Sequence, residues 1–297
     1  MSTPRSIDEY LDQLRAALKG ADPAMIQDAL YDAEEHLRSE LAENPQTGEA
    51  ALLEKICGSY GAPDEVAEIY RNQEKVVMRA LRPPPPRPRS SWLGRFFGVA
   101  ADLRAYAAMF YMLLALPVGI FYFTWVVTGV SMSMGFAVLI IGAPFTVLFF
   151  GSVRMLSLLE GRIVEAMLGV RMPRRPPYTD RDQPWLARIG RMFTDPRTWS
   201  SLFYMLVMLP LGIIYFTILV TGLAISLAFI AQPFGQIFWH LPIAQIENIS
   251  YYVPAWCWPL EFAFGLFGLF VMLHVARGIG RLHGGIAKHL LVKTAQA

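Results

Sequence analysis

Few side chains outside the polar first segment of this 297-residue chain could bind a ligand or exchange a proton. Three of them, His240, Glu247 and Glu261, lie in or just after the aromatic-rich residues 235–258. Histidine changes its charge near neutral pH, and carboxylates among aromatic rings can hold the polar end of an otherwise apolar molecule. We therefore predict a site for an apolar or lipid-like ligand, or a pH-sensing site, in this region. Its candidate residues are Trp239, His240, Glu247, Tyr251, Tyr252, Trp256 and Glu261.

The same residues also have simpler explanations. Tryptophan and tyrosine collect where helices meet the surface of a bilayer, and Glu261 could extend its carboxylate to that surface. The sequence shows no paired carboxylates, histidine-rich metal set or nucleophile motif, and Cys57 and Cys257 are too few for a disulfide framework. The sequence therefore predicts a protein without enzymatic activity, metal or cofactor.

The composition argues against an ordinary soluble enzyme. Apolar residues make up 54% of the chain and charged residues only 17%, against about 25% charged residues in an average soluble domain. The net charge of +2 hides a division, because residues 1–78 carry an excess of nine acidic side chains and residues 79–297 an excess of eleven basic ones. The first residues are polar and acidic, so we expect no cleavable signal peptide and a first segment in the cytosol.

Residues 1–78 show four stripes of apolar residues at helical spacing, which predict a small soluble helical bundle. Asp22 followed by Pro23 is typical of a helix start, and Pro63 opens the last stripe in the same way. We interpret the acidic residues between the stripes, Asp28 among them, as a solvated helix face. A core from fewer than about 80 residues is marginally stable, so docking onto another part of the chain would stabilise it.

Residues 79–91 form a Pro- and Arg-rich linker, whose proline run predicts an extended polyproline spacer. Beyond it, residues 105–153 and residues 198–246 contain no Asp, Glu, Lys or Arg. A bilayer span needs about 20 apolar residues, and these runs with the apolar segment after residue 258 predict four transmembrane helices. We place the spans near residues 105–130, 134–156, 199–226 and 258–277.

Basic residues determine the expected orientation of these spans. They occur before the first span, between the second and third, and after the fourth, whereas the two other loops contain no Lys or Arg. We therefore predict a multi-pass protein of a bacterial cytoplasmic (inner) membrane with both termini in the cytosol. Attraction to anionic lipids explains the basic residues, so membrane lipids are expected partners and direct nucleic-acid binding is not expected.

The membrane part contains an internal repeat. Residues 111–129 return at residues 204–222 with an offset of 93, including matched Pro, Gly, Tyr and Thr residues. Two copies of two spans each run in the same direction, which predicts a module of two parallel repeats, residues 92–171 and 185–292, related by an axis along the membrane normal. The second copy has roughly 30 additional residues near 235–258.

Each copy of the repeat contains a proline followed two residues later by a glycine: Pro117 with Gly119, and Pro210 with Gly212. A proline inside a helix removes a backbone hydrogen bond, so the first span of each copy is expected to bend there. Both a hinge and a fixed packing feature would account for these residues.

The turn at residues 60–67, Tyr-Gly-Ala-Pro-Asp-Glu-Val-Ala, follows two amphipathic helices and resembles the HAAS family of small helical signalling domains. The resemblance covers roughly residues 5–72. Such domains are often associated with PadR-like winged-helix regulators. The resemblance therefore implies that residues 1–78 bind a cytosolic PadR-like transcription regulator or another signalling protein.

The motif Leu-Pro-x-Gly-x-x-Tyr-Phe-Thr at residues 116–124, its copy at 209–217, and Asp-Pro-Arg-Thr-Trp at 195–199 carry a second resemblance. They are similar to the sensor domain at the N-terminus of many bacterial, especially actinobacterial, sensor histidine kinases. The resemblance covers about residues 100–292 and implies a four-span sensing module. We find neither a phosphoacceptor histidine motif nor a glycine-rich ATP-binding segment, so we expect any output to leave through the helical head.

Together these features predict an all-α protein in which a soluble helical bundle is joined by a Pro-rich linker to a four-helix transmembrane module. We expect a sensor without its own kinase that detects an envelope or lipid-like signal and relays it through the head to a cytosolic regulator. The acidic head could dock on the basic surface of the membrane module. The alternative is a small transporter or lipid-handling protein with a regulatory head, although its nearly charge-free spans are unlike those of ion-coupled transporters. The sequence leaves open whether the protein forms a homodimer.

Overall fold

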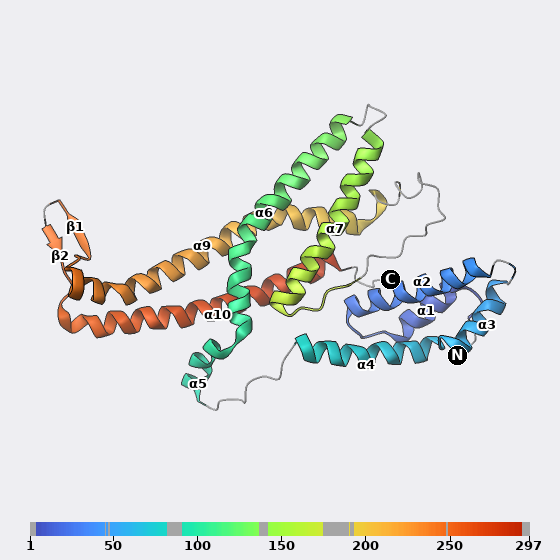
Figure 1. Cartoon of the computed structure of the whole chain (residues 1–297), viewed down its shortest axis with the longest axis horizontal. Coiled ribbons are helices and arrows are strands. Elements are labelled where there is room, and N and C mark those ends of the chain that lie inside the picture. Colours follow the sequence, from blue (N-terminus) through green and yellow to red (C-terminus); the bar gives the residue numbers. More distant parts are fainter. Residues whose placement is uncertain are drawn as a thin grey trace. The chain divides into compact units, whose positions relative to one another are not determined.

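The structure of the chain is a computed structural model that describes residues 4–44, 46, 48–81, 91–136, 142–174, 190, 193–247 and 249–292. Helices dominate these residues, and the strands found among them form one small two-stranded hairpin (Figure 1). The all-α fold class predicted from the sequence is therefore confirmed.

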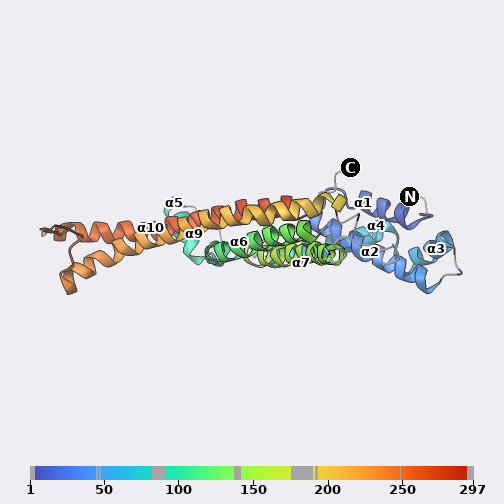
Figure 2. The same ribbon diagram turned by 90° about the horizontal axis from the view of Figure 1, so that it is seen from above.

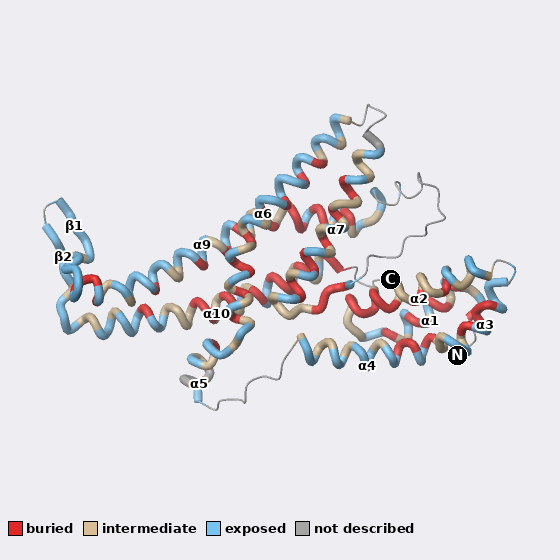
Figure 3. Tube along the Cα trace, in the orientation of Figure 1, coloured by how far each residue is buried: buried red, intermediate tan, exposed pale blue. Residues whose placement is uncertain are grey.

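Four helices form the N-terminal head. They are α1 (Ile7–Ala17), α2 (Pro23–Glu43), α3 (Glu49–Ser59) and α4 (Pro63–Leu81). Their apolar stripes enclose one core, so buried residues lie along the helices of the head (Figure 3). Tyr10, Leu14 and Leu53 in this core are almost completely buried. Burying an apolar side chain of this size contributes about 1.5–3 kcal/mol relative to leaving it exposed. Core packing, more than helix propensity, therefore stabilises the head.

Local hydrogen bonds fix where the helices of the head begin and turn. The Oγ atom of Ser6 accepts a hydrogen bond from the backbone N–H of Glu9 at the start of α1, and Asp22 caps α2 in a similar way. Gly61 adopts a φ of +113°, which favours glycine. Its carbonyl oxygen accepts a hydrogen bond of 2.9 Å from the hydroxyl of Tyr10, so the turn before α4 is tied to α1.

The last helix of the head is longer than the sequence predicts. It continues to Leu81, so residues 79–81, predicted to belong to the linker, are helical. The reason is that no proline interrupts the chain before Pro83. The rest of the proline run, residues 82–90, lies outside the described residues.

Long helices make up most of the C-terminal part. They are α5 (Trp92–Phe97), the 3₁₀ helix η1 (Gly98–Ala101), α6 (Leu103–Phe136), α7 (Gly142–Leu168), α9 (Pro196–Trp239) and α10 (Trp258–Leu291). Three described segments are long and apolar enough to cross a membrane: Leu103–Phe136, Pro196–Trp239 and Ala255–Leu291. Large apolar side chains on them are exposed, as Phe110 and Phe264 show, which is expected of helices surrounded by lipid.

The helix ends differ from the predicted ends of the spans. α6 continues to Phe136, although the sequence predicts a second span from about residue 134, and α9 and α10 run well past their predicted spans. Hydropathy marks only the part of a helix that is long enough to cross the apolar layer of a bilayer. The helix itself continues until its backbone hydrogen bonds are interrupted. Within the described residues α7 is not among the segments apolar enough to span, and residues 137–141 before it are not described.

The chain divides into two compact units, and each contains segments that are far apart in the sequence. One unit contains residues 1–85, 126–204 and 284–297, and the other contains residues 86–125 and 205–283. The head therefore shares a unit with α7 and with the end of α10. Buried ion pairs between the head and the segment after α7 account for this grouping.

In the second unit, α9 and α10 lie side by side in both views (Figures 1 and 2). A Cβ atom on Gly265 would lie 2.6 Å from the carbonyl oxygen of Ser226, so the close approach of the two helices requires glycine here. A hairpin of β1 (Ala244–Ile246) and β2 (Ile249–Tyr251) lies between α9 and α10 in the chain. Glu247 in its turn has a φ of +56°, which is typical of two-residue hairpin loops.

Candidate functional site

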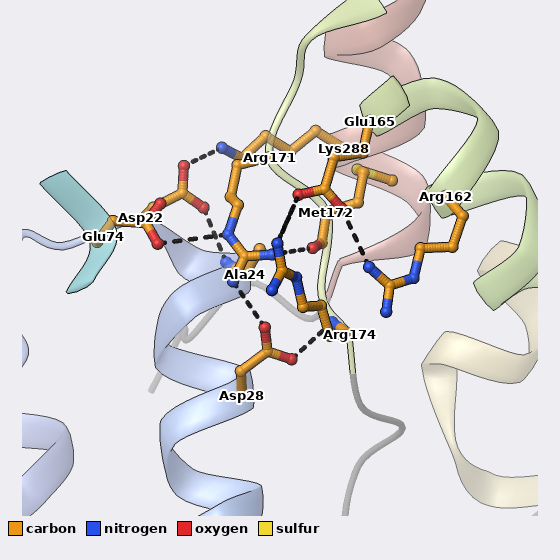
Figure 4. Close-up of polar contacts among 10 residues, drawn as sticks. All are labelled: Asp22, Ala24, Asp28, Glu74, Arg162, Glu165, Arg171, Met172, Arg174 and Lys288. Atoms are coloured by element: carbon orange, nitrogen blue, oxygen red, sulfur yellow. Dashed lines mark hydrogen bonds and ion pairs between the residues drawn. The ribbon is translucent and has the colours of Figure 1, made fainter. Parts of the chain in front are cut away.

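Arg171, just after α7, is the centre of a buried ion cluster (Figure 4). Its side chain is only 6% exposed. The Nη2 atom lies 2.9 Å from Oδ2 of Asp28, Nε lies 3.3 Å from Oε2 of Glu74, and Nη1 lies 3.4 Å from Oε1 of Glu165. Because Asp28 belongs to α2 and Glu74 to α4, one arginine of the C-terminal part binds two helices of the head.

The end of α7 places Arg171 against the head. Gly169 follows the helix with a φ of +67°, and its N–H donates a hydrogen bond to the carbonyl oxygen of Glu165. The chain then turns toward α2, where the backbone N–H of Arg174 donates a hydrogen bond of 2.6 Å to Oδ1 of Asp28. Backbone and side-chain bonds together attach this segment to the head.

The charges of the cluster are nearly balanced. Arg171 alone could not neutralise three carboxylates, but Arg162 lies 3.5 Å and Arg174 lies 3.8 Å from the carboxylate of Glu165. Burial on its own lowers the pKa of Arg171, yet the neighbouring carboxylates, Asp28 foremost, outweigh burial and raise that pKa above its ordinary value. Arg171 therefore stays charged, and its removal would take a buried positive charge away from Asp28 and Glu74.

A second ion pair attaches the head to the end of α10. The Nζ atom of Lys288 contacts Oδ2 of Asp22, the residue that caps α2. The other carboxylate oxygen of Asp22 accepts a hydrogen bond of 2.9 Å from the N–H of Ala24. This pair is more exposed than the Arg171 cluster, at 28% and 19%, so dissolved salt screens it more effectively.

Beside the Arg171 cluster, the first unit contains a cavity of about 250 Å³. Its lining residues are Met25, Asp28, Asp32, Tyr70, Gln73, Glu74, Val77, Arg171 and Arg174. The Oε1 atom of Glu74 is buried and has no hydrogen-bond partner in the structure, so water is expected to occupy this polar space. Such water would lower the free-energy cost of separating the charges.

The cluster is suited to positioning. In the part of the chain that the structure describes, no group of three His, Cys, Asp or Glu side chains could hold a metal ion. Buried ion pairs contribute little net stability, but removing one partner leaves an uncompensated charge. The arrangement can therefore hold the head in one orientation, and opening it requires the whole set of charges to become solvated together.

The residues predicted to bind a ligand lie around the hairpin and the neighbouring helix ends. His240, with a φ of +49°, follows α9, Glu247 lies in the hairpin turn, and Glu261 lies in the first turn of α10. Among the described residues no hydrogen bond or ion pair joins these three. The aromatic members are exposed: Trp239, Tyr251, Tyr252 and Trp256. A ligand site here stays a prediction.

The prolines of the two repeats lie inside α6 and α9, and both helices continue through them. A Cβ atom on Gly119 would lie 2.6 Å from the carbonyl oxygen of Met208, and one on Gly212 would contact the carbonyl oxygen of Ala115. The glycines therefore allow the two helices to cross closely, which is a packing role. A hinge at the prolines stays a prediction.

The sequence predicts that the acidic head could dock on the basic surface of the C-terminal part, but it does not predict which residues of the Arg171 cluster make the contact. The interpretation of Asp28 as a solvated residue is wrong, because its side chain is buried and binds Arg171. A sequence signal exists in α2, because the apolar residues 24–26 precede Asp28 and the apolar residues 29 and 30 follow it. A carboxylate inside such a stretch must find a cation.

Two family models match the chain. The model described as Putative sensor matches residues 111–291, and the model described as HAAS matches residues 9–69. No curated protein and no solved structure matches. The fold and these matches define a membrane signalling protein, and neither family is one of enzymes. The chain belongs to the sensor family, whose match covers more than half of it, and its head is a HAAS domain.

Proposed function

We propose that this protein senses a signal in or at the bacterial cytoplasmic membrane and relays it by releasing its HAAS head. The observation that carries the proposal is the buried contact of Arg171 with Asp28 and Glu74. In the docked arrangement these faces of α2 and α4 are covered. A released head exposes them to a cytosolic regulator, for which a PadR-like winged-helix protein is the candidate.

Four spans with cytosolic termini support this proposal. The first half of α7 carries no charged residue before Arg154, so we assign it to a span together with α6, α9 and α10. The distribution of basic residues assigns the head, Arg171 and Lys288 to the same side of the membrane. Contacts between the head and both residues are consistent with this assignment.

Equivalent positions of the two copies make equivalent contacts, which supports a module of parallel repeats. First-span residues correspond at an offset of 93 and second-span residues at 123, the difference being the roughly 30 additional residues of the second copy. The pair Arg154–Asp195 matches Arg277–Asp102, and the pair Glu160–Tyr204 matches His283–Tyr111. The approach of Phe149 to Gly129 matches that of Met272 to Gly222. Each pair joins the second span of one copy to a first span or the segment before it. A change in repeat packing would therefore move the ends of α7 and α10, which hold the head.

The relay requires a signal that binds one arrangement of the spans better than the other. The Arg171 cluster suits such an equilibrium, since its charges exchange protein partners for water when the head leaves. A tenfold preference of the signal corresponds to about 1.4 kcal/mol. Docked and released heads that differ by a few kcal/mol could thus be interconverted by an ordinary ligand.

The test is recovery of cytosolic proteins with the full chain from detergent-solubilised membranes. Arg171→Ala should free the head and raise recovery of the regulator several-fold over the unchanged protein. Arg15→Ala removes an exposed arginine of the head whose pair with Asp12 is local, and it should leave recovery unchanged. Recovery of the same proteins by a chain that lacks residues 1–78, or no effect of Arg171→Ala, would overturn the proposal.

A further inference from the structure

A small polar pocket lies between the middle of α7 and the start of α9, and the Arg171 cluster does not include it. It is lined by Arg154, Ser157, Leu158, Asp195, Arg197, Thr198 and Ser201. Its volume of about 20 Å³ admits a water-sized group. The pocket can therefore receive oxygen atoms of a ligand whose remainder stays outside.

Positive charge is in excess in this pocket, with two arginines and one carboxylate. Arg154 is shared, because its Nη2 atom lies 3.2 Å from Oδ2 of Asp195 and 3.5 Å from Oγ1 of Thr198. The Nη1 atom of Arg197 is buried and has no hydrogen-bond partner in the structure. A buried guanidinium N–H without an acceptor costs free energy, and an anionic oxygen would recover it.

Hydroxyl groups surround the arginines. The side chains of Ser157, Thr198 and Ser201 are all buried. Since Oγ1 of Thr198 accepts from Arg154, its own proton is available to another acceptor. The pocket also lies at the N-terminal turn of α9, where the helix dipole favours negative charge.

The other copy of the repeat provides an internal comparison. At the equivalent positions it keeps both arginines, Arg277 and Arg104, and the ion pair of Arg277 with Asp102 at 3.4 Å. The three hydroxyl side chains are replaced there by Gly280, Ala105 and Ala108. The ion pair itself therefore does not require hydroxyl groups. The Nη2 atom of Arg104 is likewise buried without a hydrogen-bond partner in the structure, so the hydroxyl groups, and not the unpartnered guanidinium, distinguish the pocket beside Arg154 and Arg197.

Exposed apolar side chains indicate the source of the anionic oxygen. Trp199 and Phe203 on the first turns of α9 are 55% and 57% exposed, and the Nε1 atom of Trp199 donates to the carbonyl oxygen of Phe193. We propose that the pocket binds the phosphate group of an anionic phospholipid, whose acyl chains cover this apolar surface. Arg197 and Thr198 donate to the phosphate oxygens, and Arg154 is shared with Asp195. The inference rests on the proposed membrane position of α9 and not on release of the head.

The test counts lipid molecules bound to the full chain by native mass spectrometry, with phosphatidylglycerol or phosphatidylcholine added to the detergent-solubilised protein. The unchanged protein should retain phosphatidylglycerol preferentially. Arg197→Gln should weaken that retention about tenfold, as expected for loss of a charged hydrogen-bond donor. Arg104→Gln changes the equivalent arginine of the pocket without hydroxyls, and it should weaken retention less than about twofold.

Thr198→Ala keeps every charge and copies Ala105 of the other repeat, so it separates recognition by the hydroxyl from general attraction and from misfolding. It should weaken phosphatidylglycerol retention, and a cooperative thermal unfolding transition would show that the variant is still folded. Equal losses in Arg197→Gln and Arg104→Gln, or equal retention of the two lipids, would overturn the proposal. Inorganic phosphate forms a separate arm: binding of phosphate that excludes the lipid, and that Arg197→Gln removes, would overturn the lipid as its source. None of these counts depends on the head, so they are independent of the partner-recovery test.

Discussion

Gly119 of α6 and Gly212 of α9 lie at one crossing, and each lies against the backbone of the other helix. Their positions differ by the offset of the sequence repeat, and so do the residues that each one meets. The crossing is therefore reciprocal, and both glycines are needed to keep the two helix axes close.

Replacement of Gly119 by alanine is expected to destabilise the second unit. Its new Cβ atom would lie 2.6 Å from the carbonyl oxygen of Met208, so one backbone must move. The expected cost in the free energy of unfolding is about 1–3 kcal/mol. Gly135→Ala on the same helix has open space around it and should cost almost nothing. Thermal unfolding of the full chain in detergent measures both, and equal midpoints would contradict the crossing.

Loss of Arg171 is expected to destabilise the docked head strongly. Arg171→Ala removes the guanidinium from Asp28 and Glu74, and breaking a buried pair of this kind costs about 3–5 kcal/mol. In the double variant with Asp28→Asn, part of that loss should be recovered, because one uncompensated charge is removed. Hydrogen exchange of the amides in α2 and α4 within the full chain reports the effect. Additive losses in the two single variants would show that Arg171 and Asp28 are not coupled.

Two buried tyrosines are expected to stabilise equivalent contacts. The hydroxyl of Tyr204 donates a hydrogen bond of 2.9 Å to Oε1 of Glu160, which is 1% exposed. Tyr204→Phe removes this donor and should lower the free energy of unfolding by about 1–3 kcal/mol. Tyr111→Phe should have a comparable effect, since Tyr111 is bonded to the buried ring of His283.

The control for these variants is Tyr106→Phe. Tyr106 is 45% exposed, and its hydroxyl donates to the carbonyl oxygen of Ala100. The acceptor residue Ala100 is itself exposed, so no buried acceptor loses its partner and the loss should be small. Thermal unfolding of the full chain compares the three variants. An equal loss in all of them would mean that burial of the acceptor does not determine the cost.

The head is expected to lose stability in alkali. Burial raises the pKa of Tyr70 above its ordinary value, with Asp32 adding to the effect, and burial likewise raises the pKa of Tyr10. Both hydroxyls are protonated in the folded and unfolded head below about pH 10. Above that pH the unfolded chain loses these protons first, so stability falls as pH rises.

Tyrosinate absorbance of the full chain during a rise in pH measures this loss. Tyr70→Phe removes one of the two groups and should make the alkaline loss of stability shallower. Tyr31→Phe removes a tyrosine hydroxyl from the helix that carries Asp32 and is the matched control. If both variants titrate like the unchanged protein, the alkaline sensitivity has another origin.

The helices of the head could be predicted because each is determined by nearby residues. Asp22 and Pro23 mark the start of α2 and Gly61 the turn before α4, and the apolar spacing between such signals gives the core face. The ion cluster could not be found in this way. Arg171 and Asp28 are 143 residues apart, and only the folded chain shows that they meet.

The hairpin could not be predicted from the sequence for a different reason. Strands of three residues give too little alternation to be recognised, so residues 244–251 were expected only as part of an aromatic-rich insertion. The repeat could be found in the sequence because matched residues recur at a fixed offset. The contacts between its copies could not be predicted, because the offset shows which positions are equivalent and does not show which positions touch.

The head is attached at two places, one at Arg171 and one at Lys288. Arg171 lies just after α7, and Lys288 belongs to α10. When one attachment opens, the other keeps the head nearby at high effective concentration, so it closes again quickly. If the head relays a signal by release as proposed, α7 and α10 would have to change together, and the output would respond as a coincidence detector with a threshold rather than in proportion to the stimulus.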